Sequence, residues 1–407
     1  MFVRVLHLAD LHIGYCPGFL RPDKAKARSE DFKSAFERAV DYALKPENAI
    51  KAVIIAGDLF DCSNPEPGAR GFVRAQLDRL SSVSIPVLVI PGTHDTIAFP
   101  GGVYKTESFP SNVHLLAEPF SSTPLELALG GEKFTFYSLT YEPGEKRTVA
   151  EFLRSVKGSL PRDGYRVFIA HASVMGSPEW EMRRKDFPVA LGDLVSSGMH
   201  YVALGHYHNF FDSLEGESSP GQAKVVYPGT LEGKAFGENG PRHLVVASFE
   251  SGRARIEKYQ FNKRVLEEKS LSLDSEPVSS EEELLEKLSS LGNANLLLKL
   301  TLVGNPDFMV RSDFLTEALS DKFFHVEIED ATSALSSLSV EELLREKTIR
   351  GMFVRKLKEA IASLPVANES DKTDKSAAYE RAIYELALKE GLSAFAGRGI
   401  VRHSTKE

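Results

Sequence analysis

The segment Val3-Arg-Val-Leu-His-Leu-Ala9, which runs into Asp10-Leu-His12, indicates the fold within the first residues of the chain. A short apolar run rich in valine and leucine is typical of a buried strand. Asp10 and His12 are two residues apart, which predicts that both side chains lie on one side of an extended segment. In open α/β sheets, ligands bind beyond the carboxyl ends of the strands. The segment therefore predicts a ligand site at the end of its strand.

Four more short apolar runs end in histidine or aspartate. The polar residues that follow these runs are Asp58, then His94 with Asp95, then His171, and finally His206 with His208. Together the five strand ends aim three aspartates and five histidines at one crevice. Mixed imidazole and carboxylate donors favour zinc, manganese, iron or cobalt over calcium. The donors outnumber the needs of one ion, so the pattern predicts two divalent metals and hydrolytic chemistry.

Length and composition set the broad class. A chain of 407 residues predicts two or three domains, and a net charge of −8 argues against unspecific nucleic-acid binding over the whole surface. A local basic face stays compatible with that charge. No leader-like start and no apolar stretch of about 20 residues is found, so we expect a cytoplasmic protein without membrane contact. Two cysteines fit a reducing compartment.

The chain divides by pattern into four parts. Residues 1–261 alternate strand and helix and then add further strands, which predicts two stacked sheets between helical layers. Within this part we expect a basic loop over 21–28 and helices from near Ser29 and over 71–80. Residues 262–279 are charged and poorly periodic and predict a linker. Residues 280–335 predict a small α/β module, and residues 336–407 predict a helical region.

Roles for the clustered residues follow from their chemistry. Asp58 can bridge two cations with its two oxygens. His94 can act as a general acid or donate to a phosphoryl oxygen, with Asp95 orienting its ring. Cations that flank the metals would hold neighbouring phosphates, although each cluster is also compatible with a solvated surface. The candidate cations are Arg21, Lys24, Lys26 and Arg28, and Arg183 with Arg184.

The motifs Asp-x-His, Gly-Asp, Gly-x-His-Asp, a lone histidine and Gly-His-x-His, in that order, resemble the calcineurin-like metallophosphoesterases over residues 1–261. The resemblance implies an α/β fold with a four-layer α-β-β-α sandwich. It implies that Asp10, His12, Asp58 and His208 hold one metal, and that Asp58, His171 and His206 hold the other. The family pattern has asparagine where this chain has Thr93, a shorter and weaker donor to the second metal.

Three further stretches resemble the SbcD-type DNA repair exonucleases, bacterial relatives of the meiotic recombination eleven nuclease. They are Gly57-Asp-Leu-Phe-Asp61, Gly205-His-Tyr-His208, and Tyr227-Pro-Gly-Thr230 with Phe236-Gly-Glu238. This resemblance implies manganese-dependent cleavage of DNA, a carboxy-terminal capping module that binds DNA, a homodimer and an SMC-like ATPase partner docked on the last helices. Two alternatives remain open: a small-molecule phosphodiesterase or phosphatase, and a metal-poor scaffold if Thr93 abolishes the second metal site.

Overall fold

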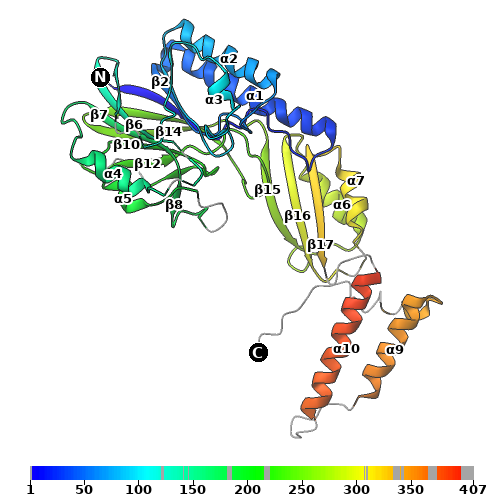
Figure 1. The fold of residues 1–407 in the computed structure, drawn as a ribbon. Coiled ribbons are helices and arrows are strands. Elements are labelled where there is room, and N and C mark those ends of the chain that lie inside the picture. Colours follow the sequence, from blue (N-terminus) through cyan, green and yellow to red (C-terminus); the bar gives the residue numbers. More distant parts are fainter. Residues whose placement is uncertain are drawn as a thin grey trace. The chain divides into compact units, whose positions relative to one another are not determined.

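The computed structural model describes most of the chain as two compact units, Met1–Leu266 and Glu267–Glu407 (Figure 1). The described residues are 2–120, 123–140, 142–144, 146–180, 186–214, 221–306, 308, 310–332, 340, 343–364 and 374–395.

The first unit contains two six-stranded sheets. In the first sheet the strand order is β14-β13-β1-β2-β3-β4. Neighbours from β1 to β4 are parallel, whereas β13 and β14 are antiparallel. The strands are β1 (Val3–Leu8), β2 (Ile50–Ala56), β3 (Val87–Ile90), β4 (Val113–Leu115), β13 (His243–Glu250) and β14 (Arg253–Gln260).

The second sheet has the order β11-β12-β10-β7-β6-β5. Its central strands are parallel, and β5 and β6 form an antiparallel hairpin that turns at Gly130 and Gly131. The strands are β5 (Leu125–Leu129), β6 (Glu132–Leu139), β7 (Tyr165–His171), β10 (Tyr201–Gly205), β11 (Phe211–Asp212) and β12 (Lys224–Tyr227). A separate parallel pair consists of β8 (Ser173–Met175) and β9 (Pro188–Ala190).

Alternate residues of β1 show how the two sheets pack. Val3 and Val5 belong to a buried cluster that also contains Phe134 of the second sheet. Leu6 and Leu8 point to the opposite face, where they share a cluster with residues of α1 and α2. Full burial of each such side chain is worth about 1.5–3 kcal/mol. A third cluster covers the far face of the second sheet, so the predicted four-layer α-β-β-α order is found in this unit.

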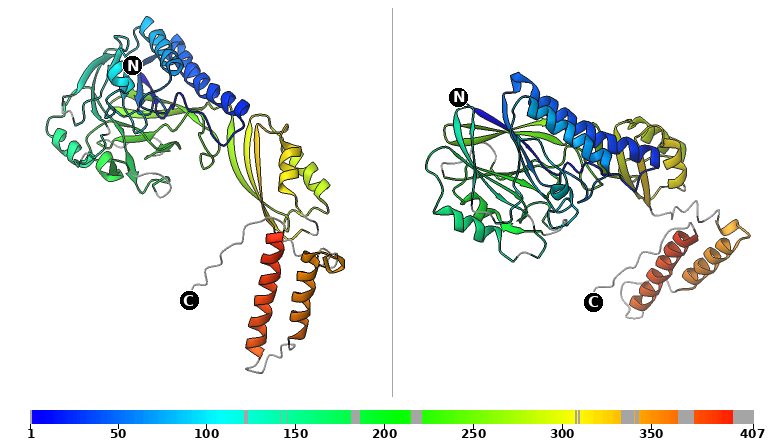
Figure 2. Two further views of the ribbon diagram at one scale, coloured as in Figure 1. Left: turned by 45° about the vertical axis from the view of Figure 1, so that its right-hand side comes forward. Right: turned by 45° about the horizontal axis from the view of Figure 1, so that its top comes forward.

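Helices cover the outer faces of both sheets (Figure 2). The first sheet is covered by α1 (Pro22–Leu44) and α2 (Pro67–Ser82), and the second by α4 (Val149–Lys157) and α5 (Leu191–Val195). The short η1 (Pro46–Asn48) and α3 (Val103–Thr106) lie in connections of the first sheet.

The expectation of a basic loop over 21–28 is wrong, because this stretch forms the first turns of α1. Proline suits the first helical position, and Pro22 occupies it, with Asp23 in the first turn. Residues 25 and 28 are buried on the same face as the later apolar residues of the helix. The apolar spacing was visible only from Phe32 onward, because Arg28 occupies a core-facing position where the pattern predicts an apolar residue.

The second unit starts with a three-stranded sheet of order β15-β16-β17. The strands are β15 (Val265–Ser272), β16 (Leu296–Gly304) and β17 (His325–Thr332), and the helices beside them are α6 (Glu281–Ser290) and α7 (Ser312–Leu319). The predicted linker over 262–279 is therefore wrong for 265–272. Only Leu266 of this strand is fully buried, so the strand has almost no hydrophobic alternation in the sequence. Its strand conformation depends on backbone pairing within the sheet, which the sequence pattern does not reveal.

Two helices complete the described chain, α9 (Ile349–Ser363) and α10 (Asp374–Phe395), which lie side by side in both figures. Val354 of α9 and Leu388 of α10 share a small buried cluster. Helix α9 begins after Thr348, whose side chain caps it. Among the described helices, none is both long and apolar enough to cross a membrane.

Candidate metal centre

The strand ends that the sequence singled out converge in the first unit. Ligand atoms of Asp10, His12 and His208 lie within 4.8 Å of one another, and so do ligand atoms of Asp10, Asp58 and His171. These residues follow or end β1, β2, β7 and β10, which belong to two different sheets. The site therefore forms where the carboxyl ends of parallel strands from both sheets meet.

Asp58 stands between the two groups of ligands. Its Oδ1 accepts a hydrogen bond from the backbone N–H of His94 at 2.8 Å. Its Oδ2 lies 3.4 Å from His171 Nε2 and 3.8 Å from His12 Nε2. A carboxylate with imidazole nitrogens on both sides of one oxygen is suited to bridge two cations. Thr93 Oγ1 lies 3.5 Å from the same oxygen, so the threonine stands at the edge of the site.

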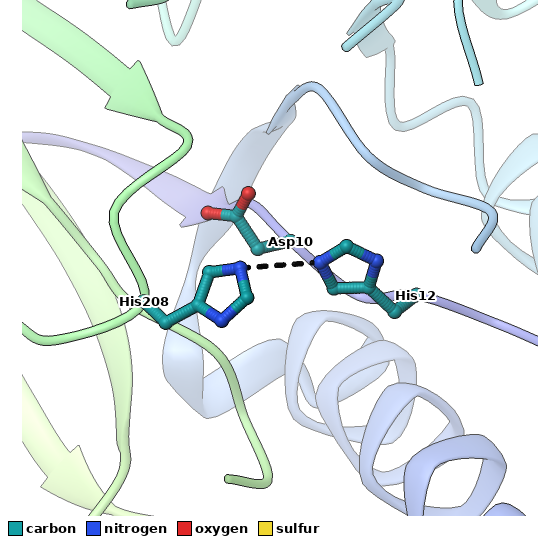
Figure 3. Close-up of side chains that lie close together, drawn as sticks. All are labelled: Asp10, His12 and His208. Carbon is teal, nitrogen blue, oxygen red and sulfur yellow. Dashed lines mark hydrogen bonds between the residues drawn. The ribbon is translucent and has the colours of Figure 1, made fainter. Parts of the chain in front are cut away.

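His12 and His208 face each other across the first group (Figure 3). Their Nε2 atoms are 3.3 Å apart, and Asp10 lies beside them. The side chains of His12 and Asp10 are fully buried and that of His208 is nearly so. Two imidazole nitrogens and a carboxylate that converge away from water form a donor set that fits a divalent metal.

His171 carries an orphaned nitrogen. Its Nδ1 lies 3.0 Å from the carbonyl oxygen of Ala56, so Nδ1–H donates there and Nε2 is the ring nitrogen that faces Asp58. Nε2 is buried and has no hydrogen-bond partner among the described residues, although Asp58 lies at 3.4 Å. A buried polar nitrogen without a hydrogen-bond partner is costly, and a cation between Nε2 and Asp58 would satisfy both groups.

The pKa shifts of Asp10, Asp58 and His171 indicate that the buried carboxylates need a cation beside them. Burial raises the pKa of Asp10 to about 7, against the lowering effect of His171 and His208. Burial also disfavours the charged form of Asp58, but the neighbouring His171 and His12 hold its pKa well below the usual range. For His171, burial lowers the pKa, while Asp58 and Asp10 outweigh it and raise the pKa to about 10. Carboxylates buried this deeply need positive charge beside them.

Four of the candidate ligand residues have left-handed backbone conformations. The φ angles are 53° at Asp10, 45° at His12, 50° at Asp58 and 107° at His206. Asp10 and His12 therefore lie on a curled segment, and the expectation of an extended one is wrong. Each such residue costs about 1–3 kcal/mol, and strain of this kind clusters at functional sites. The segment is held by N–H groups of Asp10 and His12, which donate to the carbonyls of Gly57 and Asp58 at 3.1 Å and 2.9 Å.

At two positions in the motifs, a neighbouring side chain approaches the backbone so closely that only glycine fits. A Cβ on Gly92 would lie 2.2 Å from Asp58 Oδ1, and a Cβ on Gly57 would lie 2.3 Å from His171 Nδ1. Gly57 also has a φ of 91°, which glycine adopts without strain. Both glycines therefore let ligand side chains pack directly against the backbone of a neighbouring strand end.

His206 lies beside His171, but among the described residues its ring nitrogens belong to none of the ligand groups that lie within 4.8 Å. The two rings are 5.1 Å apart between centroids, and the His206 N–H donates to both oxygens of Asp10, at 3.0 Å and 3.1 Å. Its Nε2 lies 3.8 Å from Asp186 Oδ2. Sequence reasoning missed Asp186, because it follows no strand and belongs to no motif.

His94 and Asp95 have different surroundings. The His94 side chain is 45% exposed, its ring packs edge-on against His12 at 4.7 Å, and its Nδ1 lies 3.0 Å from the Asp61 carbonyl oxygen. Asp95 is buried and accepts hydrogen bonds from Gly92 N–H and Phe60 N–H, at 2.7 Å and 3.1 Å, and from the Tyr104 hydroxyl at 2.7 Å. The expectation that Asp95 orients the His94 ring is wrong, because both its oxygens are used to hold the loop.

The candidate DNA-binding cations separate into three cases. Arg28 is 1% exposed and pairs with Glu232 at 2.6 Å and with Asp31 at 3.3 Å, so its assignment as a phosphate contact is wrong. Arg21 and Lys26 are exposed at the start of α1, and Lys24 is half-buried there. Arg183 and Arg184 lie outside the described residues.

The fold and the centre agree with one family. The family model described as calcineurin-like phosphoesterase matches residues 3–210, just over half of the chain. The chain belongs to this family of metallophosphoesterases, whose members use divalent metals, as the resemblance of the motifs implied.

Curated relatives add to this assignment. The chain is 27% identical over 256 residues to the uncharacterized metallophosphoesterase YhaO of Bacillus subtilis, covering 61% of this chain and 57% of YhaO. It is 26% identical over 360 residues to the DNA double-strand break repair protein Mre11 of Methanosarcina acetivorans, covering 86% of this chain and 53% of that protein. It is 24% identical over 256 residues to a component of the SbcCD nuclease of Staphylococcus epidermidis, covering 58% of this chain and 63% of that protein. The chain thus spans about half the length of the first two relatives.

Proposed function

We propose that the protein is a nuclease that hydrolyses phosphodiester bonds of DNA through two divalent metals, with manganese as the metal expected in the cell. The convergence of Asp10, His12, Asp58, His171 and His208 on one buried centre carries the proposal. The relatives named as a DNA repair protein and as part of a nuclease support DNA as the substrate.

The residues would divide between two metals that share Asp58. Asp10, His12 and His208 would complete one site, and His171 with His206 the other, with Thr93 at its edge. Bound divalent metals lower the pKa of a water molecule and neutralise charge on phosphoryl oxygens. The protein itself fixes the ligands through the strained loops and keeps most of them away from bulk solvent.

His94 is the side chain best placed to act as a general acid. Its Nδ1–H is held by the Asp61 carbonyl, so Nε2 is the nitrogen left to act. The side chain is about half exposed and touches the ring of a ligand, His12. In the protonated form His94 would donate to a phosphoryl or leaving oxygen, which is typical of general acid catalysis.

The second unit and the basic start of α1 complete the proposal. Residues Arg21, Lys24 and Lys26 would bind the DNA backbone, and the sheet module over 267–332 would act as a capping module that contacts DNA. Helices α9 and α10 expose several large apolar side chains, which supports docking of an SMC-like ATPase there. These side chains are Ile349, Met352, Tyr379, Ile383 and Leu386. We also propose a homodimer, which analytical ultracentrifugation of the full chain would test.

The decisive experiment is cleavage by the full chain after manganese loading. Labelled duplex DNA and bis-p-nitrophenyl phosphate serve as parallel substrates, with EDTA as the metal-free control. We expect both substrates to be cleaved only with metal. Ester cleavage without DNA cleavage would favour a small-molecule phosphodiesterase. Fewer than about one bound ion per chain, measured by elemental analysis, would instead favour the metal-poor scaffold.

A further inference from the structure

The loop after β12 reaches the side of His208 that faces away from the cluster. His208 Nε2 points to His12, and its Nδ1 lies 2.7 Å from Glu238 Oε1. A carboxylate only accepts, so Nδ1 carries the proton and Nε2 keeps its lone pair toward the cluster. Glu238 is 0% exposed. This glutamate therefore sets both the tautomer and the orientation of the imidazole.

Glu238 is in turn held by the backbone of the same loop. Its Oε2 accepts the Lys234 N–H at 2.8 Å, and its own N–H donates to the Ala235 carbonyl at 3.1 Å. The loop is thus closed on itself, and the position of Glu238 depends on the conformation of residues 234–238.

Lys234, at the start of the loop, reaches the other histidine of the pair. Its Nζ lies 2.8 Å from Asp61 Oδ1, and that oxygen lies 3.1 Å from His12 Nδ1. The ammonium packs over the Tyr15 ring at 4.6 Å, and the Tyr15 hydroxyl donates to the Lys234 carbonyl at 2.9 Å. The side chain of Lys234 is only 11% exposed. Nζ also lies 3.2 Å from His12 Nδ1 itself. Both groups are nearest to Asp61 Oδ1, and the ammonium has no lone pair, so Asp61 accepts from the ammonium and from the imidazole, and Lys234 fixes the carboxylate that orients His12.

We propose that Lys234 and Glu238 are positioning residues that present the Nε2 atoms of His12 and His208 to one divalent metal. A single five-residue loop thereby sets the geometry of two ligands that come from different sheets. The inference rests on the proposed function only in requiring that these two histidines bind a metal. It assigns a role to the Phe236-Gly-Glu238 stretch that the ligand motifs do not explain.

The test uses Glu238→Gln in the full chain. Glutamine keeps the size of the side chain, but an amide nitrogen facing His208 would favour the tautomer with its proton on Nε2, the nitrogen that must bind the metal. We expect manganese binding at this site to weaken by about 10- to 100-fold in isothermal titration calorimetry. Selective 15N-histidine NMR of the metal-free protein should show the proton of His208 moving from Nδ1 to Nε2, which a purely structural loss would not produce.

A second variant and a control keep the result interpretable. Lys234→Met keeps the approximate length of the side chain but removes the ammonium that donates to Asp61 and lies over Tyr15, and we expect about tenfold weaker manganese binding. Glu250→Gln, at an exposed position at the end of β13, should bind as the wild type does. A folded Glu238→Gln protein with wild-type affinity and tautomer would overturn the proposal. If that variant does not fold, unchanged affinity in Lys234→Met would overturn it. Neither readout uses DNA cleavage, so inactivity of the wild type toward DNA would count against the nuclease alone.

Discussion

The two halves of the metal centre are held in place by different kinds of groups. In the half with His12 and His208, each imidazole has a carboxylate against its outer nitrogen, Asp61 at 3.1 Å and Glu238 at 2.7 Å. In the half with His171 and His206, the Ala56 carbonyl orients His171 at 3.0 Å, and the Asp186 carboxylate is 3.8 Å from His206. A carboxylate partner makes an imidazole a stronger ligand. If the two halves hold one metal each, as proposed, we expect tighter binding in the His12 half, because both of its imidazoles have a carboxylate partner.

The largest effect should come from removing the residue that both halves share. Asp58→Asn removes the negative charge beside His12 and His171, so both sites weaken and cleavage falls on the order of 10⁴-fold. Metal stoichiometry by elemental analysis and the rate on bis-p-nitrophenyl phosphate would measure this. The matched control is Asp78→Asn on the exposed face of α2. Two tightly bound ions in Asp58→Asn would show that the halves do not share this ligand.

Removing His94 should separate catalysis from metal binding. His94→Ala leaves the ligands of both halves in place, so we expect wild-type manganese stoichiometry with turnover reduced by about 10²- to 10³-fold. A wild-type rate in a metal-loaded variant would exclude His94 from the reaction.

His7 is a buried histidine outside the candidate metal centre, and its effect on the pH dependence of stability can be measured without metal. His7 lies between the sheets, with Nδ1 2.8 Å from the Tyr201 hydroxyl, and burial lowers its pKa from 6.5 to about 3. The unfolded chain therefore binds more protons below about pH 6.5, and stability is lost as the pH falls from there toward 3. Between about pH 7 and pH 5 the metal-free protein should lose about 2 kcal/mol through this group.

Urea unfolding at both pH values would measure this loss, with His7→Asn as the comparison. The variant keeps a polar group near Tyr201 but does not titrate, so its stability should change less with pH. An equal pH dependence in the variant and the wild type would contradict the assignment to His7.

The smallest effect should come from Thr93, at the edge of the weaker half. An amide oxygen reaches further than a hydroxyl and is a better metal ligand, so Thr93→Asn should strengthen the second manganese site by about tenfold, or about 1.4 kcal/mol. Calorimetric titration would show the two binding steps moving closer together. Thr93→Val, which removes the oxygen at similar size, should move them apart. Identical second-site affinity in all three proteins would mean that position 93 does not contribute to the site.

Much of the first unit could be predicted from local patterns. The apolar runs of β1, β2, β3, β7 and β10 match the observed strands closely, because strands buried on both faces leave short, continuous hydrophobic stretches. The start of α1 and the strand β15 could not be predicted in this way. Arg28 is buried by an ion pair with Glu232, more than 200 residues away, and β15 depends on its pairing with the rest of its sheet.

The candidate site shows the same limit. Asp10, His12, Asp58, His171, His206 and His208 could be named from their places after apolar runs, but the partners of these residues could not. Glu238, Lys234 and Asp186 follow no strand, and their distances to the histidines arise only when loops from different sheets meet. Asp95 was assigned to the wrong neighbour for the same reason, since Tyr104 and Phe60 reach it from separate segments.

By itself, the sequence determined which strands are buried and which ligand types follow them, because burial and ligand chemistry are properties of single residues and short segments. Only the tertiary structure decided how these ligands are aimed. The left-handed turns at Asp10, His12 and Asp58 and the carboxylates behind His12 and His208 depend on contacts between distant parts of the chain. Such contacts leave no periodic signal, since each is a single hydrogen bond made across the fold.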